Sequence, residues 1–459
     1  MLHTLHPTLT EGSVSRHLYS MAMPMVWGLL ATMSFNAVDT FFVAQLGDNA
    51  LAAMGFTFPV VAVLTAVAIG VGAGTSSSVA RAIGAGNETF TRRLATDGMS
   101  LTLLTSIVVS FLGWLTIDPL FSALGASPEL LPLIRDYMSI WYLSAPFLMV
   151  PMVTMASMRA MGKSHIQGYI MIAAAIFNAL IDPLLIYGLL GFPRLEMKGA
   201  ALATLITRAL ILAVAFYILQ GRLQMLVNPF VRLRVVRASW RVIMHIGMPA
   251  MVSNMIIPLS SMVVVRLVSE FGANAVAGLS VAVRIEPIAL IVFYALSGVV
   301  GPFCGQNLGA GMRDRLLEVL RVLTVFCLGF GVFLGIVLWF AGETIAAPFS
   351  DTPEILSVAV QYLILVPFSY GAYGIVMSIN AAFNGLGMPL PGLVISFLRV
   401  IGIYLPLVWP MMTLFGLSGL FVATALTNIT TGGLAYFWLR IRLGGLPENC
   451  GAEPNKRAA

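Results

Sequence analysis

The chain has 459 residues, of which 59% are hydrophobic and only 10% are charged. Soluble domains carry about 25% charged residues, so this composition excludes a soluble domain and indicates an integral membrane protein. The net charge of +6 at pH 7 is explained by basic residues in cytoplasmic loops, so we expect no nucleic-acid partner.

In chain order, a fairly polar stretch at 1–16 precedes an apolar run that is too long for a cleavable signal core. A helix crosses a bilayer with about 20 mostly apolar residues, and the chain meets that length repeatedly. We predict an all-α integral membrane protein with twelve transmembrane helices. The spans are placed near 17–45, 50–80, 94–117, 134–156, 166–190, 198–220, 242–270, 275–304, 318–342, 355–383, 390–414 and 417–440.

The first six spans and the last six repeat each other in sequence. MAMPMVWG at 21–28 matches IGMPAMVS at 246–253, an offset of 225 residues (246 minus 21). Three further pairs share this offset: LGDNALAAMG with FGANAVAGLS, RAIGAGN with QNLGAGM, and SMRAMGKS with AFNGLGMP. We interpret this as an internal duplication into two six-helix lobes. Since six is even, the repeats run parallel, which is typical of transporters that bind substrate between them.

The duplication and the charges predict the domains and their orientation. We expect an N-terminal lobe at 1–220, a basic cytoplasmic linker at 221–241, a C-terminal lobe at 242–440 and a polar cytoplasmic tail at 441–459. Loops after even-numbered spans carry most of the Lys and Arg; the opposite side carries only Arg135, Arg194, Lys198 and Arg266. This asymmetry places both termini in the cytoplasm of a bacterial inner membrane. We expect the protein to act as a monomer.

Two aspartates fall inside predicted spans of the first half, Asp39 in FNAVDTFF and Asp182 in FNALIDPLLIYG. An intramembrane charge costs at least about 2.5–3.5 kcal/mol at mid-depth, so it persists where it is paired or functional. Asn178 lies four residues before Asp182, on the same helical face. Pro183 lacks the amide that would bond the Ala179 carbonyl, which frees a further oxygen.

In the next span, Thr204 and Thr207 are three residues apart and share a face. Carboxylate, amide, carbonyl and hydroxyl oxygens suit a proton or Na⁺ better than a soft metal. The neutral residues alone fit interhelical hydrogen bonding equally well. The carboxylates favour a cation site, because we identify no basic partner in the same half and expect Arg208, near a span end, to extend to the interface.

The duplicated half provides an internal comparison for these positions. At the repeat offset, Asp39 aligns with Val264 and the nearby Asn36 with Ser261, while Asp182 stands opposite Leu405. The fold is therefore built without the acids, which favours a specialised cation site in the first half.

In the second half, Arg284, Glu286 and Arg399 lie inside predicted spans. Pro287 disturbs the helix that carries the first two. Pairing of Glu286 with Arg284 or Arg399 is favoured over direct substrate contact, and both interpretations stay open. We group these three residues with Asn36 and Thr207 as a substrate-cavity or structural polar cluster.

VDTFFVAQLGDNALAAMG, the RAIGAGN and QNLGAGM pair, MRAMGKS, FNALIDPLLIYG and KGAALATLITR together resemble the multidrug and toxic compound extrusion (MATE) family over roughly 15–440. RIEP at 284–287 resembles the DinF-like branch. The resemblance implies two six-helix lobes, cation coupling and export of amphipathic compounds, with a cation site at Asp39, Asn178, Asp182 and Thr204. The NorM-like branch carries acids in helices seven and ten, whereas SNMIIPLSS and FSYGAYGIVMS have none.

These features favour a non-enzymatic antiporter without a cofactor, driven by H⁺ or Na⁺, since no ATPase or hydrolase motif is found. We expect it to export amphipathic, cationic organic compounds or drugs as its lobes rock between inward-open and outward-open states. A first alternative is a lipid-linked precursor flippase, which needs a basic cavity for pyrophosphate. A second is a membrane scaffold or receptor, which leaves the two aspartates unexplained.

Overall fold

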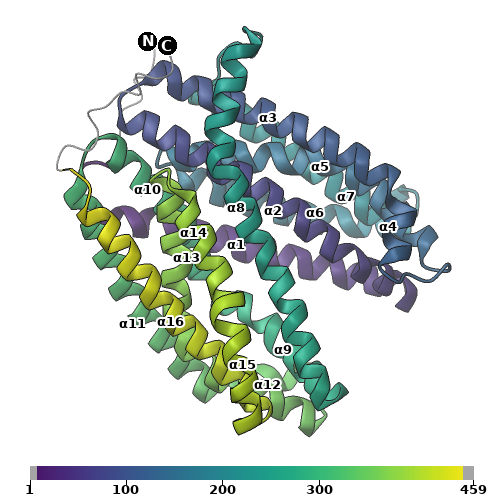
Figure 1. The fold of residues 1–459 in the computed structure, drawn as a ribbon. Helices are drawn as coiled ribbons and strands as arrows, with labels where there is room; N and C mark the ends of the chain where they lie inside the picture. The colour runs from purple at the N-terminus through teal and green to yellow at the C-terminus, as the bar shows by residue number, and fades with distance from the viewer. Residues whose placement is uncertain (1–7, 448–459) are drawn as a thin grey trace. The chain divides into compact units, whose positions relative to one another are not determined.

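The structure is a computed structural model that describes residues 8–447, and this part of the chain is built of helices (Figure 1). Twelve of its segments are long and apolar enough to cross a membrane, as the sequence predicts. Cys450 and most of the predicted tail at 441–459 lie outside the described residues.

Local chemistry sets several helix ends in the first half. The Asn87 side chain accepts a hydrogen bond from the Phe90 amide (3.0 Å), which satisfies a donor that the first turn of α3 leaves free. Helix α6 ends at Tyr187 and is followed by Gly188, whose φ of 73° favours glycine. The helices are α1 (Val14–Ala44), α2 (Asp48–Gly84), α3 (Glu88–Leu115), α4 (Ile117–Ala123), α5 (Leu131–Ala160), α6 (Ser164–Tyr187), the 3₁₀ turn η1 (Leu189–Gly191), α7 (Glu196–Tyr217) and the π-helical turn η2 (Ile218–Arg222).

The second half differs from the prediction because three expected spans are interrupted. The span at 275–304 breaks at Leu290, three residues after Pro287; the span at 355–383 breaks at Pro367; and the span at 390–414 contains a π-helix. Proline removes a backbone donor, which explains the first two breaks. The elements are α8 (Leu233–Val268), η3 (Ser269–Phe271), α9 (Ala273–Ala289), α10 (Ile291–Gly309), α11 (Arg313–Ala346), η4 (Ala347–Phe349), α12 (Pro353–Leu365), η5 (Pro367–Ser369), α13 (Tyr370–Gly385), α14 (Pro389–Phe397), η6 (Leu398–Tyr404), α15 (Leu405–Phe415) and α16 (Leu417–Gly444).

The described chain divides into two compact units. The first unit contains residues 23–251, and the second contains residues 8–22 and 252–447. Both divisions therefore fall inside long helices, α1 and α8, and each lies close to one of the repeated prolines, Pro24 and Pro249.

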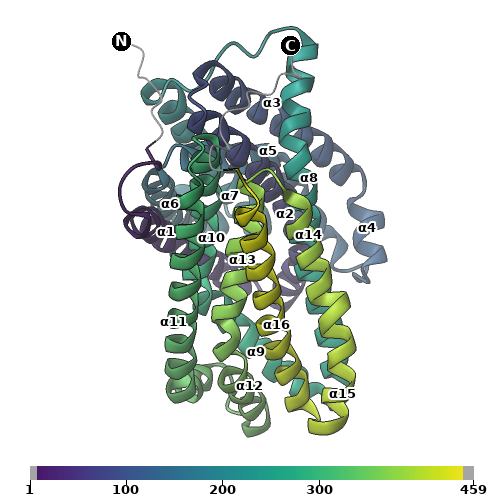
Figure 2. The ribbon, with the colours of Figure 1, turned by 60° about the vertical axis from the view of Figure 1, so that its left-hand side comes forward.

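In each unit, the equivalent helix of the sequence repeat packs against several neighbouring helices. In the first unit α5 packs against α2, α3 and α7. In the second unit α13, which aligns with the end of α5 at the repeat offset, packs against α10, α11 and α16 (Figure 2). In the first unit the central helix α5 belongs to the most enclosed span, so polar residues that face it are removed from lipid.

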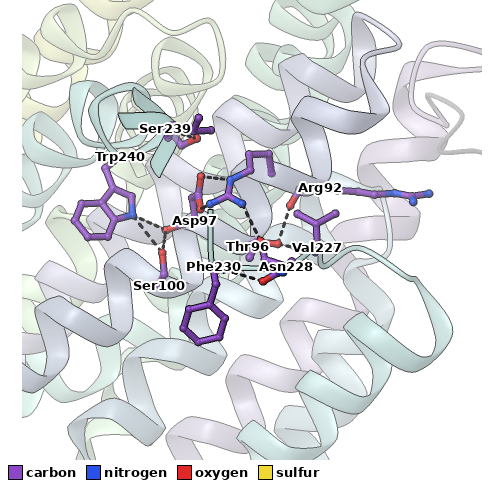
Figure 3. A network of polar contacts seen from close by, with 11 residues as sticks. Arg92, Thr96, Asp97, Ser100, Val227, Asn228, Phe230, Ser239 and Trp240 are labelled. Carbon is purple, nitrogen blue, oxygen red and sulfur yellow. Dashed lines mark hydrogen bonds and ion pairs between the residues drawn. The ribbon is translucent and has the colours of Figure 1, made fainter. Parts of the chain in front are cut away.

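The stretch between α7 and α8 is fastened to the start of α3 in the first unit (Figure 3). The Val227 amide donates to Thr96 Oγ1 (3.0 Å), and Arg93 Nη1 donates to the Asn228 carbonyl (2.9 Å). Since Val227 and Asn228 belong to the predicted basic linker, these bonds fix its path along α3.

The same contact surface encloses an ion pair. Asp97 is 1% exposed and accepts from Arg93 through both Nε (2.7 Å) and Nη2. The carbonyl of Asp97 accepts from Trp240 Nε1 (3.0 Å), so the start of α8 is held at this point too (Figure 3). Removing one member of a buried pair leaves the other charge unpaired, which is far costlier than losing a surface pair.

We expect Arg93→Met to release the linker, with a loss of about 3–5 kcal/mol of stability, because Asp97 stays enclosed without its partner. Trypsin should then cleave at the exposed Arg232 and Arg234 sooner, and the thermal midpoint in detergent should fall. Arg92→Met is the matched control, since the ion pair of Arg92 with Glu88 is longer, at 3.5 Å, and lies within α3. Equal protection of the two variants would contradict this assignment.

Candidate functional site

Helices α6 and α7 place a group of polar side chains inside the first unit. Asn178 and Asp182 are fully buried on one face of α6, and Thr204 and Thr207 on α7 are each 4% exposed. Asn178 Nδ2 donates to Thr207 Oγ1 (3.2 Å), which joins the two helices. Thr207 is thus occupied by a structural hydrogen bond, whereas Thr204 is not.

Helix α1 supplies the second carboxylate. Asp39 is 5% exposed and lies within electrostatic range of Asp182, although the two residues are far apart in the sequence. Two carboxylates that interact in this way take up and release protons as a coupled pair.

Several oxygen atoms of this group are enclosed without a hydrogen-bond donor. They are Asp39 Oδ1, Asn178 Oδ1, both carboxylate oxygens of Asp182, and Thr204 Oγ1. An enclosed carboxylate without a partner is costly, and a proton or a cation relieves that cost. The donor set consists only of oxygens, which fits H⁺ or Na⁺. Within residues 8–447, no three His, Cys, Asp or Glu side chains gather as they do around a transition metal.

Arg208 corrects one expectation from the sequence. It does not extend to the interface: the side chain is half-buried, Nη1 donates to Ser144 Oγ (2.6 Å), and the guanidinium lies 4.9 Å from the Trp141 ring centre. Asp39 is within its electrostatic range. The first half therefore contains a basic residue near the aspartates, although no ion pair joins Arg208 to either of them among the described residues.

Tyr137 was also missed by the sequence analysis. It is 5% exposed and lies within electrostatic range of both aspartates and of Arg208. The sequence spacing could have predicted this polar face, because Tyr137, Trp141 and Ser144 recur at helical intervals on one face of α5. Arg208 likewise follows Thr204 by four residues on α7.

The other predicted polar residues do not join this group. Asn36 is exposed, and its carbonyl accepts from Thr40 Oγ1 (2.8 Å). The pairing of Glu286 with Arg284 is wrong: Glu286 accepts from Tyr362 Oη (2.9 Å), whereas Arg284 is exposed. Two residues apart on a helix, Glu286 and Arg284 point to different faces.

Comparison with known proteins identifies the family. The MatE family model matches residues 24–184 and 249–410, two segments that begin 225 residues apart (249 minus 24). The chain belongs to the MatE family. It is a multi-pass membrane transporter of small organic compounds in a family of ion-coupled exporters, and it is not an enzyme.

Individual relatives span nearly the full length. The FAD transporter of Shewanella oneidensis is 38% identical over 94% of this chain and 95% of its own. The multidrug export protein MepA of Staphylococcus haemolyticus is 26% identical over 93% of each. The crystal structure of the Vibrio cholerae MATE transporter VcmN in the bent form superposes with a TM-score of 0.90 and 30% identity, covering 96% of this chain and 98% of that one.

Proposed function

We propose that this MatE-family chain is an antiporter that couples entry of H⁺ or Na⁺ to export of an organic compound. The coupling ion binds at Asp39 and Asp182, assisted by Asn178 and Thr204. The observation that carries this proposal is the set of enclosed carboxylate, amide and hydroxyl oxygens that lack donors. Binding of a cation neutralises the site and so favours one state of the transporter over the other, which is how two sites become coupled.

The exported compound is, in this proposal, FAD or a related organic phosphate. Support comes from the 38% identical relative, which is named an FAD transporter. The pyrophosphate of FAD is anionic and needs a basic partner; the second unit provides the half-buried Arg399 and the exposed Arg284. Cationic drugs, the class expected from the sequence, are the second candidate; the relative named a multidrug export protein and the two aspartates favour them.

The charges of the loops support a membrane location and an orientation for the chain. We propose that the chain acts as a monomer in the bacterial inner membrane with both termini in the cytoplasm, since the basic residues cluster in the loops on that side.

The test is flux into liposomes that contain the purified protein and carry either a proton or a sodium gradient. We expect one gradient to drive FAD accumulation above its equilibrium level, and dissipating that gradient to abolish it. Accumulation of ethidium but not FAD would replace the anionic substrate with the cationic class. If transport of either compound is unchanged by both the proton and the sodium gradient, the antiport mechanism is wrong.

A further inference from the structure

The second unit contains a polar cluster with a different chemistry. Glu286 on α9, hydrogen-bonded by Tyr362 of α12, lies within electrostatic range of Arg399 in η6. The Arg399 guanidinium carbon lies 3.9 Å from the centre of the Tyr373 ring on α13. Tyr294 on α10 lies within electrostatic range of the same arginine. One acid, one base and several tyrosines thus converge from separate helices.

The Arg399 side chain has unused donors. Among residues 8–447 its guanidinium donates no hydrogen bond and forms no ion pair, and Tyr373 is its ring contact. The residue is half-buried, and none of its nitrogen atoms is an enclosed group without a partner, so they remain accessible. The contact with Tyr373 holds the guanidinium over the ring, and a guanidinium has five N–H donors.

The position of Arg399 also calls for a function. It lies ten residues after the start and sixteen before the end of the candidate span Pro389–Phe415, and so in the central part of that span. A charge at such a depth pairs with another charge or faces a water-filled path that a substrate uses. The surrounding backbone is π-helical from Leu398 to Tyr404, a rare conformation that is frequent at functional sites.

We propose that Arg399, held over the Tyr373 ring, is an anion-recognition residue that binds the phosphate oxygens of the exported compound. Arginine binds phosphate through two parallel N–H donors, a geometry that Lys cannot reproduce. Glu286, held by Tyr362, is a nearby negative charge whose attraction for Arg399 competes with that of the phosphate. This deepens the proposed export of organic phosphates and rests on it for the choice of probe.

The test is equilibrium binding of FAD, FMN and riboflavin to purified protein, followed by flavin fluorescence without any gradient. The three compounds share one ring system, and only the first two carry phosphate. We expect Arg399→Gln to weaken FAD and FMN binding at least tenfold while riboflavin changes less than twofold. The affinity of Arg399→Lys for FAD and FMN should lie between those of the wild type and of Arg399→Gln. Glu286→Gln keeps the Tyr362 contact but removes the competing charge, so FAD should bind several-fold more tightly.

Arg266→Gln is the matched control, since Arg266 is an exposed cation at the end of α8 and bonds only to Ser269 (3.2 Å). Equal weakening of FAD and riboflavin by Arg399→Gln, or weaker FAD binding by Glu286→Gln, would overturn the subsite. So would a folded wild-type protein that binds neither FAD nor FMN. If both bind through Arg399 but no gradient drives their flux, the subsite stands and the proposed antiport is wrong.

Discussion

Replacing either buried aspartate of the first unit should uncouple transport while leaving the protein folded. We expect Asp39→Asn and Asp182→Asn each to lower gradient-driven substrate accumulation in vesicles at least tenfold, and the double variant to abolish it. The physical reason is that Asn keeps the size and shape of the carboxylate but can neither take up a proton nor attract a cation with a full charge. The coupling ion then has no differential affinity for the two states.

The effect on stability should run the opposite way. The carboxylate oxygens of Asp182 are enclosed without donors, and an unpaired buried charge is destabilising. Asn variants should therefore keep or raise the thermal midpoint in detergent, which separates a coupling role from a packing role. Asp118→Asn is the control: Asp118 is paired at 2.7 Å with Arg135, but both side chains are exposed, and such surface pairs contribute about 0–1 kcal/mol.

Two results would contradict this assignment. One is undiminished, gradient-driven accumulation by both single variants at normal levels of folded protein. The other is a loss of accumulation that always accompanies a lower thermal midpoint, because the aspartates would then be needed for the fold. The aligned Val264 and Leu405 of the second half make that second result unexpected, since those positions are apolar in a unit that folds.

Local spacing explains which features could be read from the sequence. The twelve spans follow from runs of apolar residues, and the duplication follows from one constant offset, which the family match repeats at 24–184 and 249–410. Asn178 and Asp182 share a face of α6 because four residues make about one helical turn. The position of Asp39 relative to them was an inference from membership of the same six-helix half, since three other spans separate α1 from α6.

The features that sequence reasoning missed depend on contacts between distant segments. Arg208 is turned inward because Trp141 and Ser144, on α5, offer it a ring face and a hydroxyl. Glu286 is paired with Tyr362, 76 positions away, and its neighbour Arg284 is not involved. The breaks at Leu290 and Pro367 show a related limit: proline predicts a disturbed turn, but packing decides whether the helix bends or ends.

A further large effect is expected where α2 crosses the start of α8 in the first unit. Gly70 and Gly74, four residues apart on α2, face Ile243, Gly247 and Met251 of α8. A methyl group added at Gly74 would collide with the Ile243 carbonyl oxygen and lie 3.0 Å from the Gly247 nitrogen. These obstacles are backbone atoms, so no change of rotamer relieves the collision. Small residues at such crossings let membrane helices approach closely, and dispersion forces between them then hold the pair.

We therefore expect Gly74→Ala to lower the free energy of unfolding by about 1–3 kcal/mol, the usual cost of overpacking. Gly72→Ala is the matched control on the same helix, because its methyl would meet only the Ala156 side chain, at an ordinary 3.7 Å. Ala favours helix over Gly by about 1 kcal/mol in an exposed helix, so the control should be neutral or stabilising. Thermal midpoints in detergent and levels of folded protein in membranes provide the comparison. Equal midpoints for the two variants would mean that α2 and α8 separate easily, and the crossing would then not hold the start of α8 to the first unit.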